Sequence, residues 1–86
     1  AKEAAPRNIR VNVLAPGPVD NAFQLEIEER ASKASGTNVT EILNNWISLG
    51  RHASPQEIAN TAYFLASNKS SFSTGSVFMA DGGMHI

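Results

Sequence analysis

The sequence predicts an α/β fold in which two parallel strands are joined by a helical connection. Two stretches predict the strands: apolar residues alternate with others over Ile9–Ala15, and an apolar run fills most of Ser76–Ala80. A third stretch, from Ser54 to Glu57, has the composition of a helix start, and we expect that helix to run to about Ser67. A strand, a crossover helix and a second strand in this order form one parallel unit.

In the first predicted strand, the odd-numbered residues of Ile9–Ala15 are apolar and point to one face, whereas the even-numbered residues point to the other. We expect Pro16-Gly17-Pro18 to end this strand, because proline cannot donate a hydrogen bond to a ladder. The stretch ahead of it, Ala1–Ala5, favours helix but is too short to form one alone. It is therefore predicted to be the tail of a helix that begins upstream.

Two further helices are predicted between the first strand and the crossover helix. Asn21 is the expected N-cap of a helix over Ala22–Ser35, and Asn38 is the expected N-cap of a second helix over Val39–Ile47. Small polar residues near the end of the first helix predict that it frays there. Ala22–Ser48 is thus predicted to be a mobile helical excursion with an apolar surface.

The crossover helix has the strongest local signal in the chain. Ser54 is the expected cap, Pro55 takes the first helical position, where its missing N–H costs nothing, and Glu57 completes a capping box. The apolar surface of this helix is wider than one contact needs, so we predict that it buries one face on the sheet and another against a second subunit. The second strand, Ser76–Ala80, is predicted to be buried on both faces.

The composition excludes several classes of protein. The 86 residues suffice for one small domain, 1–86, and a net charge of −1 without a basic stripe argues against nucleic acid or an anionic membrane as partner. No apolar run reaches the roughly 18 residues of a membrane span. The absence of cysteine excludes disulfides and fits a cytoplasmic location. His52 and His85 lack carboxylate or cysteine companions, so no metal site is predicted.

Two parallel strands covered by one helix do not make a stable domain. One face and one edge of such a sheet would be bare. The residues alone therefore predict that the chain is a piece of something larger or is completed by a partner.

The order of short motifs along the chain resembles the carboxy-terminal third of a classical short-chain dehydrogenase/reductase. The motifs are IRVN, PGPV, LGR, SPQEIANTAYFLAS, STG and DGG, and only Ala22–Ser48, the family's variable substrate lobe, is unmatched. The resemblance implies a Rossmann-type doubly wound parallel sheet. Ile9–Ala15 and Ser76–Ala80 would be its last two strands, with the crossover helix and the helical substrate lobe (22–48) between them.

The resemblance implies a cofactor-binding role for the residues that follow the first strand. In the family, the segment that matches Pro16, Gly17 and Val19 lies against the nicotinamide of NAD or NADP. The backbone at the Val19 position bonds the carboxamide, and the glycine leaves room for the cofactor. The family usually has threonine where this chain has Asn21, so Asn21 is a cofactor contact, a helix N-cap or both. Without the family, the same residues predict only a turn that ends a strand.

The resemblance further implies that four apolar residues line the substrate lobe: Phe23, Leu25, Trp46 and Ile47. Such a lobe closes over substrate and nicotinamide and excludes water, and its apolar character favours a substrate with a hydrophobic part. The alternative is that these side chains only pack the lobe. We expect Arg51 and Glu57 to form a charge pair or capping contacts, and Asp81-Gly82-Gly83 to give the chain a tight path.

The family moves a hydride between NAD(P) and an alcohol or ketone, with a tyrosine as general acid/base, a lysine beside it and a serine that orients the carbonyl. This chain has no phosphate-binding glycine fingerprint, and its only tyrosine, Tyr63, is followed four residues later by Ser67 instead of lysine. We therefore assign no catalytic residue here and expect them upstream of Ala1. The chain alone should be inactive.

The parent enzyme is expected to be a homo-oligomer that pairs through Pro55–Ser67 and Ser76–Ala80. Two alternatives stay open. One is a non-enzymatic, self-associating interaction module, and the other is a small binder of the nicotinamide ring that uses only Pro16–Val19. The substrate, the reaction direction and the choice between NAD and NADP also stay open.

Overall fold

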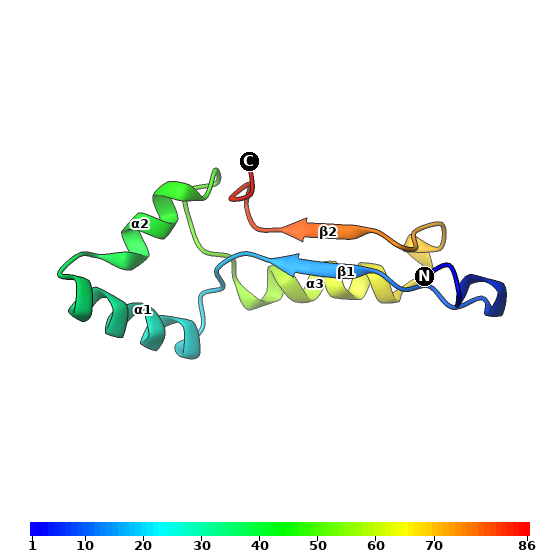
Figure 1. Cartoon of the computed structure of the whole chain (residues 1–86), viewed down its shortest axis with the longest axis horizontal. Helices are drawn as coiled ribbons and strands as arrows, with labels where there is room; N and C mark the ends of the chain where they lie inside the picture. The colour runs from blue at the N-terminus through cyan, green and yellow to red at the C-terminus, as the bar shows by residue number, and fades with distance from the viewer.

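The computed structural model describes residues 1–86, which form two parts arranged end to end over 53 × 23 × 22 Å (Figure 1). One part is a two-stranded sheet with a helix along one face, and the other is a pair of helices beyond the end of the sheet. The elements are the short 3-10 helix η1 (Ala5–Arg7), β1 (Val13–Pro16), α1 (Ala22–Ser35), α2 (Val39–Trp46), α3 (Pro55–Ala66), the 3-10 helix η2 (Asn68–Ser70) and β2 (Val77–Ala80).

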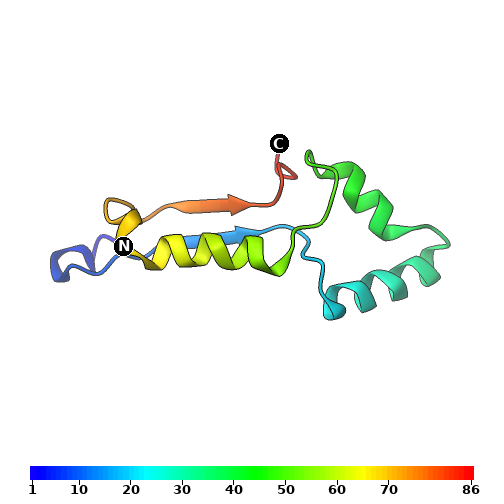
Figure 2. The ribbon, with the colours of Figure 1, turned by 180° about the vertical axis from the view of Figure 1, so that it is seen from behind.

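The strands β1 and β2 are parallel, with Val13 beside Val77 and Pro16 beside Ala80. Helix α3 runs alongside β1 in both views (Figures 1 and 2). The predicted α/β unit of strand, helix and parallel strand is therefore confirmed.

Strand β1 is shorter than predicted. Where the sequence predicts its first residues, hydrogen bonds between side chains and the backbone take the place of ladder bonds between strands. The N–H of Val11 donates to Oγ1 of Thr74 at 3.1 Å, and Oδ1 of Asn12 accepts from the N–H of Ser76 at 3.1 Å. Residues 9–12 thus lie beside the turn before β2 without pairing with a strand.

The predicted strand end at Pro16 is wrong by one residue. The N–H groups of Val13 and Gly17 donate to β2, to the carbonyls of Ser76 and Ala80. Because donors alternate along a strand, the nitrogen of Pro16 faces the opposite edge, where a missing N–H costs no ladder bond. Pro16 is therefore the last residue of β1.

The helices follow the predictions closely, with Ile47 and Ser67 as caps just outside α2 and α3. The predicted fraying at the end of α1 does not occur. Gly36 takes a positive φ of 71° and donates to the carbonyl of Ser32, and Oγ of Ser32 accepts from the N–H of Val39 at 3.0 Å. These bonds hold the last turn of α1 against the start of α2.

One face of the sheet is bare, as predicted. The exposed side chains of Ile9, Val11 and Val13 follow one another along that face, and Val77 and Met79 are exposed on β2. The expectation that β2 is buried on both faces is therefore wrong for these 86 residues, because α3 covers only one face. Ile47 is the only buried apolar side chain.

The outer surface of α3 is also apolar. Ile58 and Leu65 are partly covered, whereas Tyr63 is 77% exposed and Phe64 is exposed as well. The prediction of an apolar surface wider than one contact needs is thus confirmed. None of the helices combines the length and the apolar character that crossing a membrane requires.

Candidate functional site

The loop after β1 lies at the carboxyl end of the sheet, between the sheet and the α1–α2 pair (Figure 1). A short parallel bridge fixes it: the N–H of Ala53 donates to the carbonyl of Pro18 at 2.9 Å, and the N–H of Asp20 donates to the carbonyl of Ala53 at 2.8 Å. Because the residues on either side of Val19 make these bonds, the N–H of Val19 points away from Ala53. It donates to no group of the chain. The loop therefore presents a fixed backbone donor without a partner.

Gly17 is required by packing within the chain. A β-carbon added at Gly17 would lie 2.8 Å from Cα of Asp81, which is closer than carbon atoms pack. The ends of β1 and β2 thus approach each other through this glycine. The close approach of Asp81 therefore explains why this position has no side chain, a reason that the sequence alone does not reveal.

Asn21 is the N-cap of α1, as one of the two predictions for it states. Its Oδ1 accepts from the N–H of Gln24 at 2.8 Å. Its Nδ2 donates to no group of the chain, so one side of the amide remains available to a ligand next to Val19.

The four apolar residues predicted to line the lobe divide into two groups. Phe23 is 74% exposed and Trp46 64% exposed, and Leu25 is exposed with them. Ile47, by contrast, is only 3% exposed and lies against Gly82, where an added β-carbon would be 2.7 Å from its Cγ2. The position of Ile47 fits the alternative that it packs the lobe against the end of β2.

The glycines after β2 give the chain the predicted tight path. Gly82 and Gly83 have φ values of 63° and 87°, a region that residues with a side chain rarely adopt. The N–H of Leu49 donates to the carbonyl of Gly82 at 3.0 Å, and Oγ of Ser48 donates to that of Gly83 at 3.1 Å. The Asp81–Gly83 turn therefore anchors the segment between α2 and α3.

Arg51 and Glu57 form the predicted pair at the start of α3. Nη1 and Nη2 of Arg51 donate to the two carboxylate oxygens of Glu57 at 2.7 and 2.9 Å. Glu57 also completes the capping box with Ser54. The hydrogen bonds from Arg51 and from the backbone of Ser54 lower the pKa of Glu57 to about 2. The Glu57 carboxylate in turn raises the pKa of Arg51.

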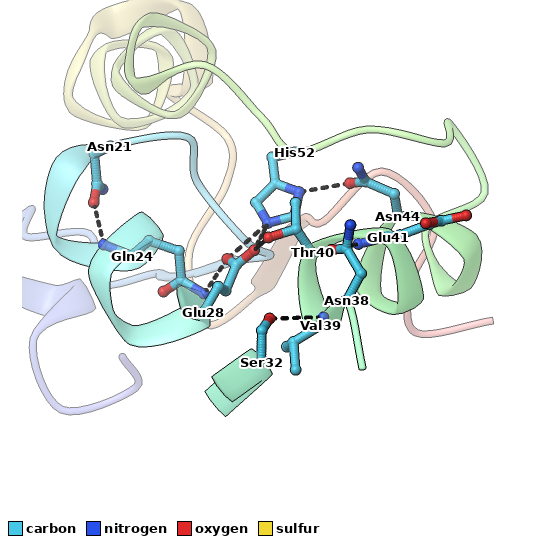
Figure 3. Close-up of polar contacts among 10 residues, drawn as sticks. All are labelled: Asn21, Gln24, Glu28, Ser32, Asn38, Val39, Thr40, Glu41, Asn44 and His52. Carbon is cyan, nitrogen blue, oxygen red and sulfur yellow. Dashed lines mark hydrogen bonds and ion pairs between the residues drawn. The ribbon is translucent and has the colours of Figure 1, made fainter. Parts of the chain in front are cut away.

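A buried polar network, which the sequence did not reveal, connects the lobe to the segment before α3 (Figure 3). Nε2 of His52 lies 2.8 and 3.0 Å from the two carboxylate oxygens of Glu28, and its Nδ1 lies 2.6 Å from Oδ1 of Asn44. Gln24 and Thr40 donate to the same carboxylate at 2.8 and 2.6 Å. The prediction that His52 lacks a carboxylate companion is therefore wrong.

Glu28 is only 2% exposed, and both of its carboxylate oxygens accept hydrogen bonds. Burial raises the pKa of Glu28, but the hydrogen bonds from Thr40, His52 and Gln24 outweigh burial and lower it. No local spacing in the sequence connects Glu28 to a histidine 24 residues away, so only the fold reveals the pair.

His85 also has a carboxylate companion, contrary to prediction. Its Nδ1 lies 2.8 Å from Oδ2 of Asp81, whose other oxygen accepts from the N–H of Gly83. Burial raises the pKa of Asp81, and the hydrogen bonds from His85 and Gly83 reverse that shift and lower it. The pair lies at the exposed end of the chain, and no third potential metal ligand joins it or the pair of Glu28 and His52.

A cavity of about 410 Å³ opens beside the buried network and reaches the loop after β1. Val19, Leu25, Glu28 and His52 are among the residues that line it. Val19, the lobe residue Leu25 and the buried pair therefore line one cavity.

The family model that describes enoyl-(acyl carrier protein) reductases matches residues 1–85. Among curated proteins, the chain is 41% identical over its whole length to 3-oxoacyl-(acyl-carrier-protein) reductase FabG of Thermotoga maritima, of which it covers 32%. The chain spans about a third of the length of the curated relatives that it matches.

Solved structures agree with this match. A short-chain dehydrogenase family protein of Francisella tularensis superposes with a TM-score of 0.90 at 34% identity, over 99% of this chain and 36% of that one. The NADPH-dependent reductase YwfH, involved in bacilysin biosynthesis, superposes with a TM-score of 0.86 at 35% identity, over 96% of this chain and 32% of that one.

Proposed function

Because this chain belongs to the short-chain dehydrogenase/reductase family, we propose that it is the carboxy-terminal third of a nicotinamide-dependent oxidoreductase. The observation that carries the proposal is the unpartnered N–H of Val19 at the carboxyl end of a parallel sheet. Ligands of such sheets bind beyond the carboxyl ends of the strands.

The residues around Val19 fit the carboxamide of a nicotinamide ring. The Val19 N–H would donate to the carboxamide oxygen, and Nδ2 of Asn21 offers a second donor nearby. Pro16 and Gly17 fix the chain path that leads to this donor. When bound, NAD or NADP supplies or accepts the hydride, and these residues hold the ring in one orientation.

The proposed substrate is an alcohol or ketone with a hydrophobic part. Phe23, Leu25 and Trp46 are exposed on the α1–α2 pair, which lies at the same end of the sheet as Val19. A covering of this kind excludes water from the hydride transfer. The name of the Thermotoga relative points to 3-oxoacyl thioesters as the first substrates to assay.

The proposed reaction needs a tyrosine, a lysine and a serine, and the only tyrosine of these 86 residues is not followed four residues later by lysine. We propose that they belong to another part of the whole protein, which also binds the cofactor phosphates, and that the isolated chain is inactive. The whole protein is proposed to be a cytoplasmic homo-oligomer. The exposed apolar surfaces of α3 and β2 support pairing through these elements.

The test compares cofactors and variants in the complete protein that carries these residues. We expect reduction of a 3-oxoacyl thioester with NADH or NADPH. A dinucleotide whose ring lacks the carboxamide should bind about tenfold more weakly, because the Val19 N–H and Nδ2 of Asn21 would both lose their acceptor oxygen. Val19→Pro removes the donor and Val19→Ala keeps it, so only the first should impair cofactor binding. Absence of NAD(P)-dependent activity in the complete protein would contradict the proposal.

A second candidate function is a self-associating module without enzymatic activity. The bare sheet face and the exposed Tyr63, Phe64 and Phe72 favour it, because surfaces of this kind are covered in stable proteins. Sedimentation of the 86-residue chain at micromolar concentration discriminates between the candidates. A folded oligomer without cofactor binding supports the module, and a folded monomer contradicts it.

A further inference from the structure

We propose that Glu28 and His52 are positioning residues that hold the α1–α2 pair of helices, the substrate lobe, at a fixed place over the loop of Val19. The inference rests on the proposed function, because it assigns the residues that orient the lobe of that site. Neither residue is proposed to touch the reacting atoms.

Three segments of the chain meet at the carboxylate of Glu28 (Figure 3). Glu28 belongs to α1 and accepts from Thr40 of α2 at 2.6 Å, and from His52, in the segment before α3, at 2.8 Å. Asn44 of α2 contacts the other side of the imidazole at 2.6 Å. The Asp81–Gly83 turn anchors the segment just after α2, whereas the pair ties both α1 and α2 to the segment before α3.

The chemistry of the pair favours one arrangement of the lobe. Both ring nitrogens of His52 have a polar partner, Nε2 in the carboxylate of Glu28 and Nδ1 in the side chain of Asn44. Glu28 is 2% exposed and the side chain of His52 is 10% exposed. Moving the lobe would leave the buried carboxylate of Glu28 without hydrogen-bond partners, which is strongly unfavourable.

The pair acts at the site through the backbone next to it. His52 directly precedes Ala53, whose N–H and carbonyl hold the residues on either side of Val19. The same segment therefore fixes the loop of Val19 through its backbone and the lobe through the side chain of His52. Leu25 and Val19 face the same cavity of about 410 Å³, so the distance between lobe and loop sets the room for a substrate.

The backbone bridge does not depend on the side chain of His52. Removing the pair should therefore free the lobe and leave the loop of Val19 in place. The expected signature is a weaker substrate interaction with unchanged cofactor affinity. A general loss of stability would instead weaken the binding of substrate and cofactor alike.

The test uses Glu28→Gln and His52→Gln in the complete protein, with Glu29→Gln as the matched control. Glu29 neighbours Glu28 on α1, is exposed and makes no side-chain hydrogen bond. Glu28→Gln keeps the size of the side chain and removes the carboxylate, and His52→Gln removes the imidazole. Amide hydrogen exchange then compares the lobe with α3, which serves as the internal reference.

We expect exchange in α1 and α2 to accelerate about tenfold in both pair variants, with α3 and the Glu29→Gln control unchanged. KM for the carbonyl substrate should rise about fivefold to tenfold, while the dissociation constant of NAD(P)H changes less than about twofold. Exchange is measurable even if the protein shows no NAD(P)-dependent activity. A failure of the proposed function is therefore distinguishable from a failure of this inference.

Two results would overturn the inference. Unchanged exchange in the lobe of both pair variants would show that the pair does not hold it. Equal acceleration in the lobe and α3 would show a general stabilising role without positioning.

Discussion

Gly17 and Asp81 follow β1 and β2 and lie in backbone contact, so close that a β-carbon at Gly17 would be 2.8 Å from Cα and 2.9 Å from Cβ of Asp81. The N–H of Gly17 also donates to the carbonyl of Ala80 at 3.0 Å, which extends the ladder by one bond. The two strand ends are thus held together where the loop of Val19 and the Asp81–Gly83 turn begin. Gly17 therefore holds the loop of Val19 next to the Asp81–Gly83 turn.

Gly17→Ala is expected to lower the free energy of unfolding by about 1–3 kcal/mol, because the methyl group has no space beside the backbone of Asp81. Urea unfolding of the complete protein measures this change. Gly36→Ala is the matched control, because it places a methyl group in open space. Only its positive φ of 71° is unfavourable for alanine, and this should lower the free energy of unfolding by about 1 kcal/mol. A Gly17→Ala variant as stable as the natural protein would contradict the close approach.

Arg10→Lys is expected to destabilise the protein by about 2 kcal/mol, because an ammonium group cannot reproduce the fork of a guanidinium. Nη1 of Arg10 donates to Ser70 and Ser73, and Nη2 donates to the carbonyls of Leu65 and Ser67, all at 3.0–3.2 Å. The guanidinium thereby holds the end of α3 on the loop that leads to β2.

The same unfolding measurement checks Arg10, with Arg7→Lys as control. Arg7 is exposed and its side chain makes no hydrogen bond, so this substitution should change stability by less than about 0.5 kcal/mol. Equal effects of the two substitutions would show that the network around Arg10 adds nothing.

The pair of Arg51 and Glu57 predicts that the stability of the first turn of α3 falls at acidic pH. The pKa of Glu57 is lowered from an ordinary value of 4.5 to about 2 in the folded protein. Because the folded-state pKa is the lower one, the contribution to stability is complete above pH 4.5 and is lost as the pH falls through about 2. NMR titration of the Glu57 carboxyl carbon checks the value, and Arg51→Gln should move the midpoint toward 4.5. A midpoint near 4.5 in the natural protein would contradict the pairing.

Much of the fold was predictable because its signals are local. Asn21, Asn38 and Ser54 cap the three helices with side-chain hydrogen bonds to residues three positions later, and a pattern at that spacing is visible in the sequence. The alternation over Ile9–Ala15 likewise predicts which side chains share a face.

The errors arise where residues far apart in the sequence meet. Thr74 and Asn12 replace ladder bonds at the beginning of β1, and this substitution depends on the turn opposite them. The pair of Glu28 and His52 joins α1 to the segment before α3. No local pattern reports such contacts, so the sequence alone predicts that His52 has no carboxylate partner.

Tyr63→Asp is expected to weaken association of the complete protein by about tenfold or more. Tyr63 is 77% exposed on α3, and a charge buried without a partner in an apolar interface is unfavourable. Sedimentation equilibrium measures the change, with Gln56→Asp, an exposed polar position on the same helix, as control. If both variants keep the natural oligomeric state, this surface of α3 is not the interface.

Two roles of Asn21 can be separated by substitution. Oδ1 of Asn21 caps α1, and Nδ2 remains free next to Val19. Asn21→Ser keeps an oxygen that accepts from the N–H of Gln24 and removes the amide donor, whereas Asn21→Ala removes both. We expect Asn21→Ala to lower the free energy of unfolding by about 1 kcal/mol and Asn21→Ser to have little effect on it. If Asn21 also contacts the carboxamide, both variants should bind NAD(P)H more weakly by a similar factor, as titration calorimetry would show. Unchanged cofactor affinity in Asn21→Ser would leave Asn21 with the cap alone, and the Val19 N–H would then be the only donor of this loop available to the ring.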